Sequence, residues 1–404
     1  MASIPHMRTP LKLALAVVAT GLLGYFLVRM VPEIRRSLTL RDSIAYWSAG
    51  RLLIERRDPY DQVSVLELER QHGYGADRPL VLRTPPWSLW MVLSLGLMGP
   101  LPAWCVWISL CLGSLLVAMR LCRRLYGEAT PRDLFSIAGY LFAPIPACLV
   151  SGQMGLALLL GVILFLWLEN RKPLLAGAAL VLPFAKPHLL SVFWLILALW
   201  MVLRRRSSIA LGFGLAFATA TGFALALDPA LFHQYRGMLR SASIGTEFIP
   251  AVSGVVRLIF FRSHFWVQFV PLALGILWSL WFFRKQYSSW SWQQHGPALL
   301  VVSVLVSPYS WLADECILLP AILQGVTFVY EARAGLKLRT KVVLVMFALL
   351  NLLLLLILRS KIPFATGIYF WSSLVWFGWY FYTRRVHSRS KRNLTPNNAL
   401  QPAS

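Results

Sequence analysis

Polar side chains beside long apolar runs are the residues of this sequence whose types and positions could do chemistry. Asp42 follows the first apolar run and begins a short segment in which Tyr46 comes one helical turn later. This spacing predicts a short helix on a membrane surface with a carboxylate at its start. Asp42 is therefore either a functional carboxylate at the interface or the N-cap of that helix. The turn at residues 58–61 (Asp-Pro-Tyr-Asp) closes the helix, and we interpret its two acids as structural.

Two cations lie where apolar runs meet polar segments. Lys186 stands between an apolar run and Pro187, and Arg257 lies in the polar stretch 228–263. A long cationic side chain at such a boundary can simply extend towards the lipid headgroups. It can also hold a phosphate at the interface through charge-assisted hydrogen bonds. Lys186 and Arg257 are therefore candidate phosphate-binding residues.

Further polar residues collect at the ends of apolar runs. Asp314 and Glu315 are adjacent acids beside such a run, and burying acids in a membrane is costly enough to favour a function for them. Gln153, His188 and Trp311 also fall at run ends. With Tyr46, these residues are candidate substrate contacts. Helix caps and interfacial anchors are the alternative for any single one of them.

The composition shows which elements must position these side chains. The chain has 404 residues, of which 58% are hydrophobic and 14% charged, and its mean hydropathy is +0.63. Soluble domains carry about 25% charged residues, so a soluble enzyme, a disordered tail and a secreted disulfide scaffold are excluded. The net charge of +23 sits mostly in short basic clusters between apolar runs, which is the pattern of membrane topology and not of nucleic-acid binding.

Twelve apolar runs predict an all-α polytopic membrane protein of about twelve transmembrane helices. The runs are 11–31, 103–122, 134–150, 154–168, 174–185, 189–203, 209–227, 265–283, 297–306, 317–330, 342–358 and 363–382. Basic clusters after every second run place both termini in the cytoplasm and the candidate site residues outside. Several runs are shorter than the usual ~20 residues, so these helices extend into flanking polar residues or are broken, as at Pro183.

The segment 86–101 conflicts with this count, because a further span would invert everything after it. We interpret it as a re-entrant or interfacial helix, with a true short span and one other run demoted as the alternative. The predicted organisation is then an N-terminal transmembrane helix at 1–31, an outer loop at 32–102, a transmembrane bundle at 103–383 with an outer loop at 228–263, and a basic cytoplasmic tail at 384–404.

Sequence motifs for cofactors are absent. The chain has no P-loop, GxGxxG, GxSxG, HExxH or D-x-D motif, its seven histidines do not cluster, and its five cysteines lack metal-ligand spacing. We therefore expect no cofactor and no bound metal, and interpret the cysteines as small buried apolar residues.

Five stretches resemble polytopic glycosyltransferases of the GT-C class, in particular glycosyltransferase family 87, the polyprenyl-phosphate-mannose-dependent mannosyltransferases. They are residues 42–61, Arg83-Thr84-Pro85-Pro86, Ser151-Gly152-Gln153-Met154-Gly155, residues 176–187 and Ser307-Pro308-Tyr309-Ser310-Trp311. The likeness spans roughly residues 40–330. The chain departs from the family pattern at 251–253, where Ala-Val-Ser replaces Asn-Gln-Ser, and by offering Asp314 and Glu315 where relatives place histidine. These departures leave the donor sugar open.

The resemblance implies a membrane-embedded transferase with a GT-C-like fold. A sugar, with mannose as the expectation, would pass from a polyprenyl-phosphate donor to a hydroxyl of a glycolipid or glycan acceptor, with inversion at the anomeric carbon. Asp42 matches the family's catalytic aspartate and would act as general base. Lys186 and Arg257 would bind the donor phosphate. Membership would also place the protein in a bacterial plasma membrane among its lipids, with the site facing the periplasm or the cell exterior.

Two other functions remain open from the sequence. A transporter or flippase for lipid-linked sugars would also have twelve spans and interfacial cations, although the chain shows no paired halves. A polysaccharide polymerase or ligase would act on the same donors at the same membrane face.

Overall fold

The computed structural model describes residues 42–241, 249–332, 338–359 and 369–394, and this part of the chain contains helices and no strand. The first half comprises α2 (Ser43–Ile54), α3 (Gln62–Gln71), the 3₁₀ turn η1 (Pro86–Ser88), α4 (Trp90–Leu93), η2 (Ser94–Leu97), α5 (Pro100–Tyr126), α6 (Arg132–Tyr140), α7 (Pro144–Ser151), α8 (Gly155–Leu168) and α9 (Pro173–Ala179). The second half comprises η3 (Pro183–Ala185), η4 (Pro187–Leu190), α10 (Ser191–Leu203), α11 (Ser207–Leu227), α12 (Leu231–Ser241), α13 (Val252–Phe260), η5 (Phe265–Phe269), α14 (Val270–Gln286), α15 (Trp292–Val306), η6 (Leu312–Leu318), α16 (Leu319–Glu331), α17 (Leu338–Arg359) and α18 (Ser372–Leu394).

Apolar helices form the body of the molecule. Among the described residues, four helices are long and apolar enough to cross a membrane: Pro100–Tyr126, Ser207–Leu227, Phe265–Gln286 and Leu312–Glu331. Two bent pairs raise the number to six if each pair is one span. The prediction of a helical membrane protein is confirmed, whereas the count of about twelve spans is not. The first predicted span, 11–31, lies outside the described residues.

The predicted run 174–185 is broken at two places. The α-helix α9 ends at Ala179, before Pro183 begins η3, and a sharper bend of 115° falls at Lys186, between Pro173–Ala185 and Pro187–Leu203. The residue before a proline is disfavoured in the helical region, and Lys186 has φ −130° and ψ 70°. At the other end of the chain, α18 continues to Leu394, so the basic residues 384–392 are helical.

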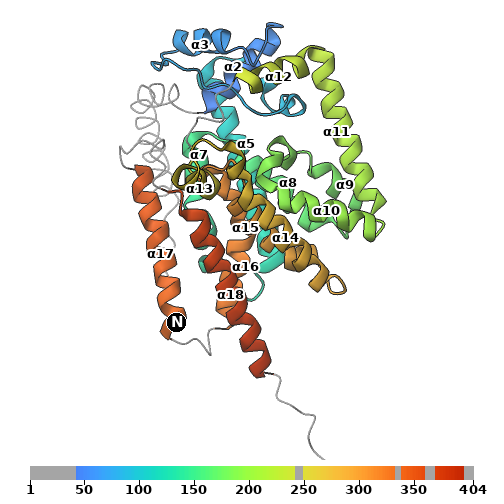
Figure 1. Ribbon diagram of the computed structural model, residues 1–404, viewed down its shortest axis with the longest axis vertical. Coiled ribbons are helices and arrows are strands. Elements are labelled where there is room, and N and C mark those ends of the chain that lie inside the picture. Colours follow the sequence, from blue (N-terminus) through green and yellow to red (C-terminus); the bar gives the residue numbers. More distant parts are fainter. Residues whose placement is uncertain (1–41, 242–248, 333–337, 360–368, 395–404) are drawn as a thin grey trace, which may run out of the picture.

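The helices α2, α3 and α12 gather at one end of the bundle (Figure 1). Basic residues mark the opposite ends of several helices: the guanidinium of Arg124 lies 5.6 Å from the ring centre of Trp167, and that of Arg204 lies 4.4 Å from the ring centre of Tyr287. These cation–π pairs bring the ends of α5 and α8, and of α10 and α14, together. Arginines are not confined to these ends, because α2 and α3 also carry them, at Arg51 and Arg70.

The segment 86–97 packs against α2 and does not form a continuous helix. It consists of η1, α4 and η2, of which α4 has only four residues. A Cβ on Gly50 of α2 would collide with the carbonyl of Val92 in α4, and a Cβ on Gly96 of η2 would collide with the backbone of Gly50. Glycine at both positions lets the two backbones touch, which holds α2 against η2.

This contact gives the first prediction. Gly50→Ala should destabilise the fold by about 1–3 kcal/mol, because the new methyl group meets backbone that cannot rotate away. Gly113→Ala on α5 is the matched control, since no atom lies within 4 Å of a Cβ there. Thermal unfolding in nanodiscs would compare the two variants. Equal stability of both would contradict the close packing of α2 on η2.

Candidate functional site

A glycine turn between α7 and α8 carries the residue at the centre of the site. Gly152 ends α7 with a left-handed conformation (φ 70°), and Gln153 follows it before α8 begins. A Cβ on Gly152 would lie 2.8 Å from Cβ of Ser43. The absence of a side chain therefore lets this turn press against the first residue of α2 and brings Gln153 beside Asp42.

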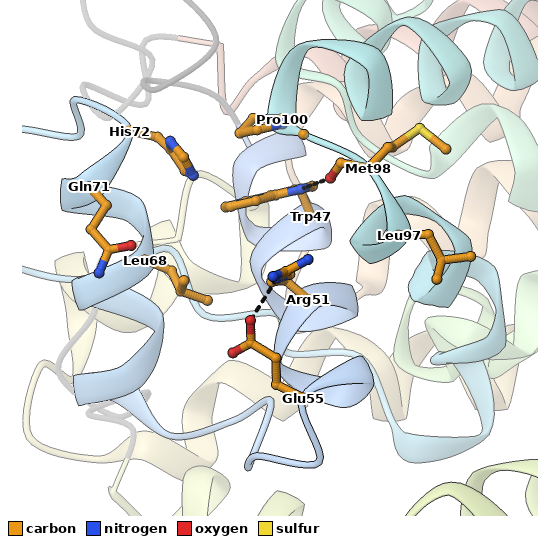
Figure 2. A pocket seen from close by; sticks show the side chains of 10 residues that line it. Trp47, Arg51, Glu55, Leu68, Gln71, His72, Leu97, Met98 and Pro100 are labelled. Carbon is orange, nitrogen blue, oxygen red and sulfur yellow. Dashed lines mark hydrogen bonds and ion pairs between the residues drawn. The ribbon is translucent and has the colours of Figure 1, made fainter.

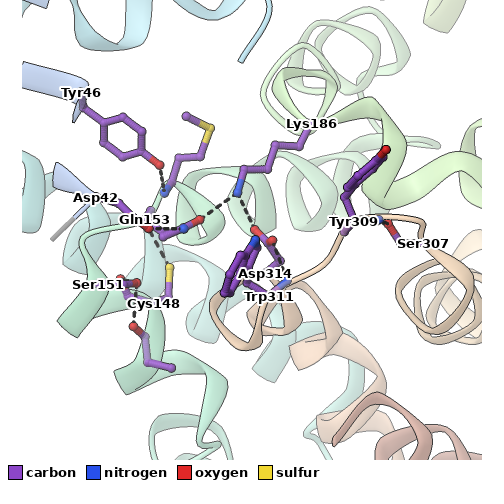
Figure 3. Close-up of polar contacts among 12 residues, drawn as sticks. Asp42, Tyr46, Cys148, Ser151, Gln153, Lys186, Ser307, Tyr309, Trp311 and Asp314 are labelled. Atoms are coloured by element: carbon purple, nitrogen blue, oxygen red, sulfur yellow. Dashed lines mark hydrogen bonds and ion pairs between the residues drawn. The ribbon is translucent and has the colours of Figure 1, made fainter. Parts of the chain in front are cut away.

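Four polar side chains from four segments form one hydrogen-bonded series, which we call the polar chain (Figure 3). Gln153 donates through Nε2 to Asp42 Oδ2 and accepts at Oε1 from Lys186 Nζ, 2.8 Å away. Lys186 Nζ also lies 2.6 Å from Asp314 Oδ1 in an ion pair. The backbone N–H of Trp311 donates to Asp314 Oδ2 at 3.1 Å. The structure thus brings together Asp42, Gln153, Lys186 and Asp314, which are separated by up to 272 positions in the sequence but were all singled out from it.

Burial makes this polar chain electrostatically strong. The side chain of Lys186 is 14% exposed and that of Asp314 is 3% exposed. A buried ion pair is stable only when each partner has further hydrogen bonds, and both partners here have them. Loss of either partner would leave a buried charge without compensation.

The side chain of Asp42 does not cap α2, which was the alternative structural role that the sequence allowed. It precedes α2, yet its side chain makes no capping hydrogen bond to that helix. Burial raises the pKa of Asp42 above its ordinary value, while the hydrogen bond from Gln153 and the charge of Lys186 lower it and the charge of Asp314 raises it. A carboxylate of raised pKa is a better proton acceptor than an exposed one, provided it remains ionised.

Tyr46 supports the glycine turn. Its hydroxyl oxygen accepts a hydrogen bond from the backbone N–H of Met154 at 3.3 Å, and its ring packs edge-on against Trp107 at 5.0 Å. Trp107 in turn donates to the carbonyl of Gly152 at 2.7 Å. Trp107 was not predicted as part of the site, because a single tryptophan in an apolar run carries no signal of this contact.

The remaining candidates His188, Trp311 and Arg257 lie in η4, at the N-cap of η6 and in α13. The ring of His188 lies 5.8 Å from that of Tyr309, and its carbonyl accepts from the hydroxyl of Ser307 at 3.3 Å. Arg257 is buried on α13 with its guanidinium 5.5 Å from the ring centre of Phe265. Within the described part of the chain, no hydrogen bond joins a member of the polar chain to His188 or to Arg257. Phosphate binding by Arg257 therefore stays a prediction from the sequence.

The adjacent acids Asp314 and Glu315 bind different partners. Asp314 joins the polar chain, whereas Glu315 accepts from the hydroxyl of Ser372 at 2.6 Å and from the indole of Trp376 at 2.8 Å. Both partners of Glu315 lie on α18. These contacts support a role for Glu315 in holding α18, although the sequence proposed it as a substrate contact.

The Asp58–Asp61 turn is structural, as predicted. Asp58 accepts from the backbone N–H of Tyr60 at 2.8 Å, and Asp61 caps α3 by accepting from that of Ser64 at 2.9 Å.

The described residues contain no cluster of three or more His, Cys, Asp or Glu side chains that could hold a metal ion.

A cavity of about 320 Å³ lies on the other side of α2 (Figure 2). Trp47 lines it and donates to the carbonyl of Met98 at 2.8 Å, and Arg51 pairs there with Glu55 at 2.6 Å. At about 100° per residue, Trp47 and Arg51 lie roughly 140° and 180° around the helix from Asp42. This cavity therefore faces away from the polar chain.

Apolar helices long enough to cross a membrane define an integral membrane protein, and a buried polar chain joins four of its segments. The sequence model of glycosyltransferase family 87 matches residues 84–308, which is more than half of the chain. The chain belongs to glycosyltransferase family 87. Comparisons with curated proteins and with solved structures gave no match. The matched region includes Gln153 and Lys186 and leaves out Asp42 and Asp314.

The contacts of Glu315 give the second prediction. Glu315→Ala should lower the free energy of unfolding by about 2–4 kcal/mol, because the hydroxyl of Ser372 and the indole of Trp376 would lose their shared acceptor. Glu315→Gln keeps one acceptor oxygen and should cost less. Thermal unfolding of the purified variants in nanodiscs measures the difference. A fully stable Glu315→Ala protein would show that α18 does not depend on this carboxylate.

Proposed function

We propose that this membrane glycosyltransferase moves a sugar, with mannose as the expected one, from a polyprenyl-phosphate donor to a hydroxyl of a glycolipid or glycan acceptor, with inversion. The observation that carries the proposal is the polar chain, in which an uncapped carboxylate, Asp42, is linked through Gln153 to a buried cation, Lys186. Transfer of a sugar from a phosphate to a hydroxyl needs a proton acceptor on one side of the sugar and positive charge on the other.

Asp42 is the proposed general base. The acceptor oxygen forms a bond to the anomeric carbon, Asp42 takes the hydroxyl proton, and the bond from that carbon to the phosphate oxygen breaks. The electron pair leaves with polyprenyl phosphate, so atoms and charge balance without a cofactor. The raised pKa of Asp42, which burial causes, favours proton transfer to it.

Lys186 is the proposed partner of the leaving phosphate. An ammonium group has three N–H donors, and two of them are directed to Gln153 and Asp314. The third can donate to a phosphate oxygen. Asp314 and Gln153 then act as positioning residues, because they hold the ammonium at the bend between η3 and η4. Arg257 and His188 are proposed to contact the donor from the surrounding segments, with Trp311 and Tyr46 forming the walls.

We further propose that the polar chain faces the periplasm or the exterior of a bacterial plasma membrane. The basic ends of α5, α8 and α10 lie away from α2, and basic loops favour the cytoplasmic side. This orientation would put Asp42 and the acceptor on the outer side.

Membership of a glycosyltransferase family favours the enzyme over a transporter or flippase, while a polymerase or ligase for lipid-linked sugars remains the second candidate.

The third prediction tests the base. Asp42→Asn should reduce transfer by about 10²–10⁴-fold, since the amide cannot accept the proton but keeps the size of the side chain. Asp77→Asn in the same loop, whose carboxylate is fully exposed, is the matched control and should leave the rate unchanged. Transfer of radiolabel from polyprenyl-phosphate mannose to a host lipid extract, in nanodiscs, measures both. An Asp42→Asn enzyme of undiminished rate would remove Asp42 from the mechanism.

The fourth prediction concerns pH. The base works when ionised, so kcat/KM should fall as the pH drops through the raised pKa of Asp42. Gln153 lowers that pKa through its hydrogen bond. Gln153→Leu should therefore raise the pKa of Asp42 and move the acid limb of the pH profile to higher pH. Gln71→Leu, at an exposed position on α3, serves as control. If the acid limb of the Gln153→Leu profile stays at the wild-type pH, a group other than Asp42 determines that limb.

A further inference from the structure

A second cavity lies between the Asp58–Asp61 turn and α12, and the proposed reaction does not use it. Its volume is about 490 Å³, within the roughly 300–1,000 Å³ of ligand pockets. It is lined by Asp58, Tyr60, Asp61, Gln62, His233, Gln234, Gly237, Met238 and Ser241. Two segments that are about 170 residues apart in the sequence thus build one cavity.

Contacts on both sides hold this cavity in shape. The hydroxyl of Tyr60 donates to the carbonyl of Thr84 at 2.9 Å, and its ring lies 5.3 Å from that of Tyr235 on α12. Across the rim, the amide of Gln62 donates to the hydroxyl of Ser241 at 3.4 Å. The cavity is therefore a formed part of the fold at the end of the bundle that carries α2.

The lining offers hydrogen-bond acceptors. Asp58 and Asp61 each receive a backbone N–H, and a carboxylate has about four lone-pair positions, so both retain capacity. The amide of Gln234 donates to Asp228 at 2.8 Å, which holds this side chain at the cavity. A ligand rich in hydroxyl groups would supply donors to the remaining lone pairs of the two carboxylates.

The charges of the lining favour a neutral ligand. Two carboxylates face the cavity, and His233 is the one lining side chain that can become cationic. Burial raises the pKa of Asp58, whereas hydrogen bonds from Ser64 lower that of Asp61. A phosphate or an acidic sugar would be repelled here. The carboxylates, amides, imidazole and hydroxyl instead match the hydroxyl groups of a neutral sugar.

Aromatic contacts connect this cavity with the polar chain. Phe232, next to His233, lies 6.4 Å from the ring of Trp87, and Trp87 lies 5.7 Å from the ring of Phe184. Trp87 also donates to the carbonyl of Phe184 at 3.0 Å. Phe184 stands two residues before Lys186. η1 therefore lies between the two, because its Trp87 contacts Phe232 next to the cavity and Phe184 close to Lys186.

We propose that this cavity binds a neutral sugar residue of the acceptor glycan, at a distance from the hydroxyl that reacts. The proposal rests on the proposed function, because it assigns the acceptor side of the same site. It implies that an oligosaccharide acceptor is bound more tightly than a single sugar residue.

Gly237→Leu adds a bulky side chain at the lining of the cavity, where no atom lies within 4 Å of a Cβ at this exposed position of α12. Leucine also has a higher helix propensity than glycine, so the helix should persist. Arg236→Leu, exposed on the same helix and outside the lining, is the matched control. Both variants leave the polar chain intact.

The experiment measures binding of a panel of neutral pentasaccharides (manno-, gluco- and galacto-oligosaccharides) by saturation-transfer NMR on the full chain in nanodiscs. We expect wild type and Arg236→Leu to bind a member of the panel, and Gly237→Leu to bind it about tenfold more weakly, which corresponds to roughly 1.4 kcal/mol. Equal binding by Gly237→Leu, no binding of any member by wild type, or tighter Gly237-sensitive binding of inorganic phosphate or Ca²⁺ would overturn the proposal.

A parallel transfer assay separates this inference from the proposed function. With acceptors of one and five residues, Gly237→Leu should raise KM for the longer acceptor about tenfold and leave kcat and the shorter acceptor unchanged. Gly237-sensitive sugar binding without any transfer by wild type would contradict the proposed function alone. Normal transfer with equal KM values in Gly237→Leu would contradict the acceptor subsite alone.

Discussion

The ion pair between Lys186 and Asp314, buried among apolar helices, is the interaction on which the arrangement of the site depends. An ammonium group in such surroundings is stable only with a close carboxylate and further hydrogen bonds, and Gln153 and the backbone of Trp311 provide the latter. These bonds join the bend before η4, the turn before α8 and the start of η6. Because Gln153 also binds Asp42, the same network holds the proposed base at the N-cap position of α2.

Close backbone contacts give this network a rigid frame. Gly152 lets the turn before α8 touch Ser43, and Gly50 lets α2 touch Gly96. Each contact excludes a side chain because backbone or Cβ atoms already occupy its place. As a result α2 is held at both ends, and the carboxylate of Asp42 is held by Gln153 and not by a capping bond to its own helix. Precise placement of a base matters because small displacements reduce proton transfer strongly.

The 3₁₀ geometry of η6 allows one short segment to serve two purposes. Three residues per turn separate neighbouring side chains by roughly 120°, so Asp314 and Glu315 diverge. Asp314 faces Lys186, and Glu315 binds Ser372 and Trp376 of α18. The proposed site is thereby tied to the packing of the C-terminal helix. On the other side, η1 ties it to α12 through Trp87, so that the second cavity and the polar chain share one support.

The sequence by itself determined the class of the protein and the candidates for its site. Long apolar runs predict membrane helices because lipid leaves backbone groups no other partner, and acids or cations beside such runs are too costly to keep without a purpose. Asp42, Gln153, Lys186 and Asp314 were selected on these grounds. Tertiary structure alone decided that these four bind one another, that Glu315 turns to α18, and that Gly50 and Gly152 are contact points. Such outcomes depend on contacts between segments far apart in the chain, and local residue patterns carry no information on which of two adjacent side chains will meet which partner.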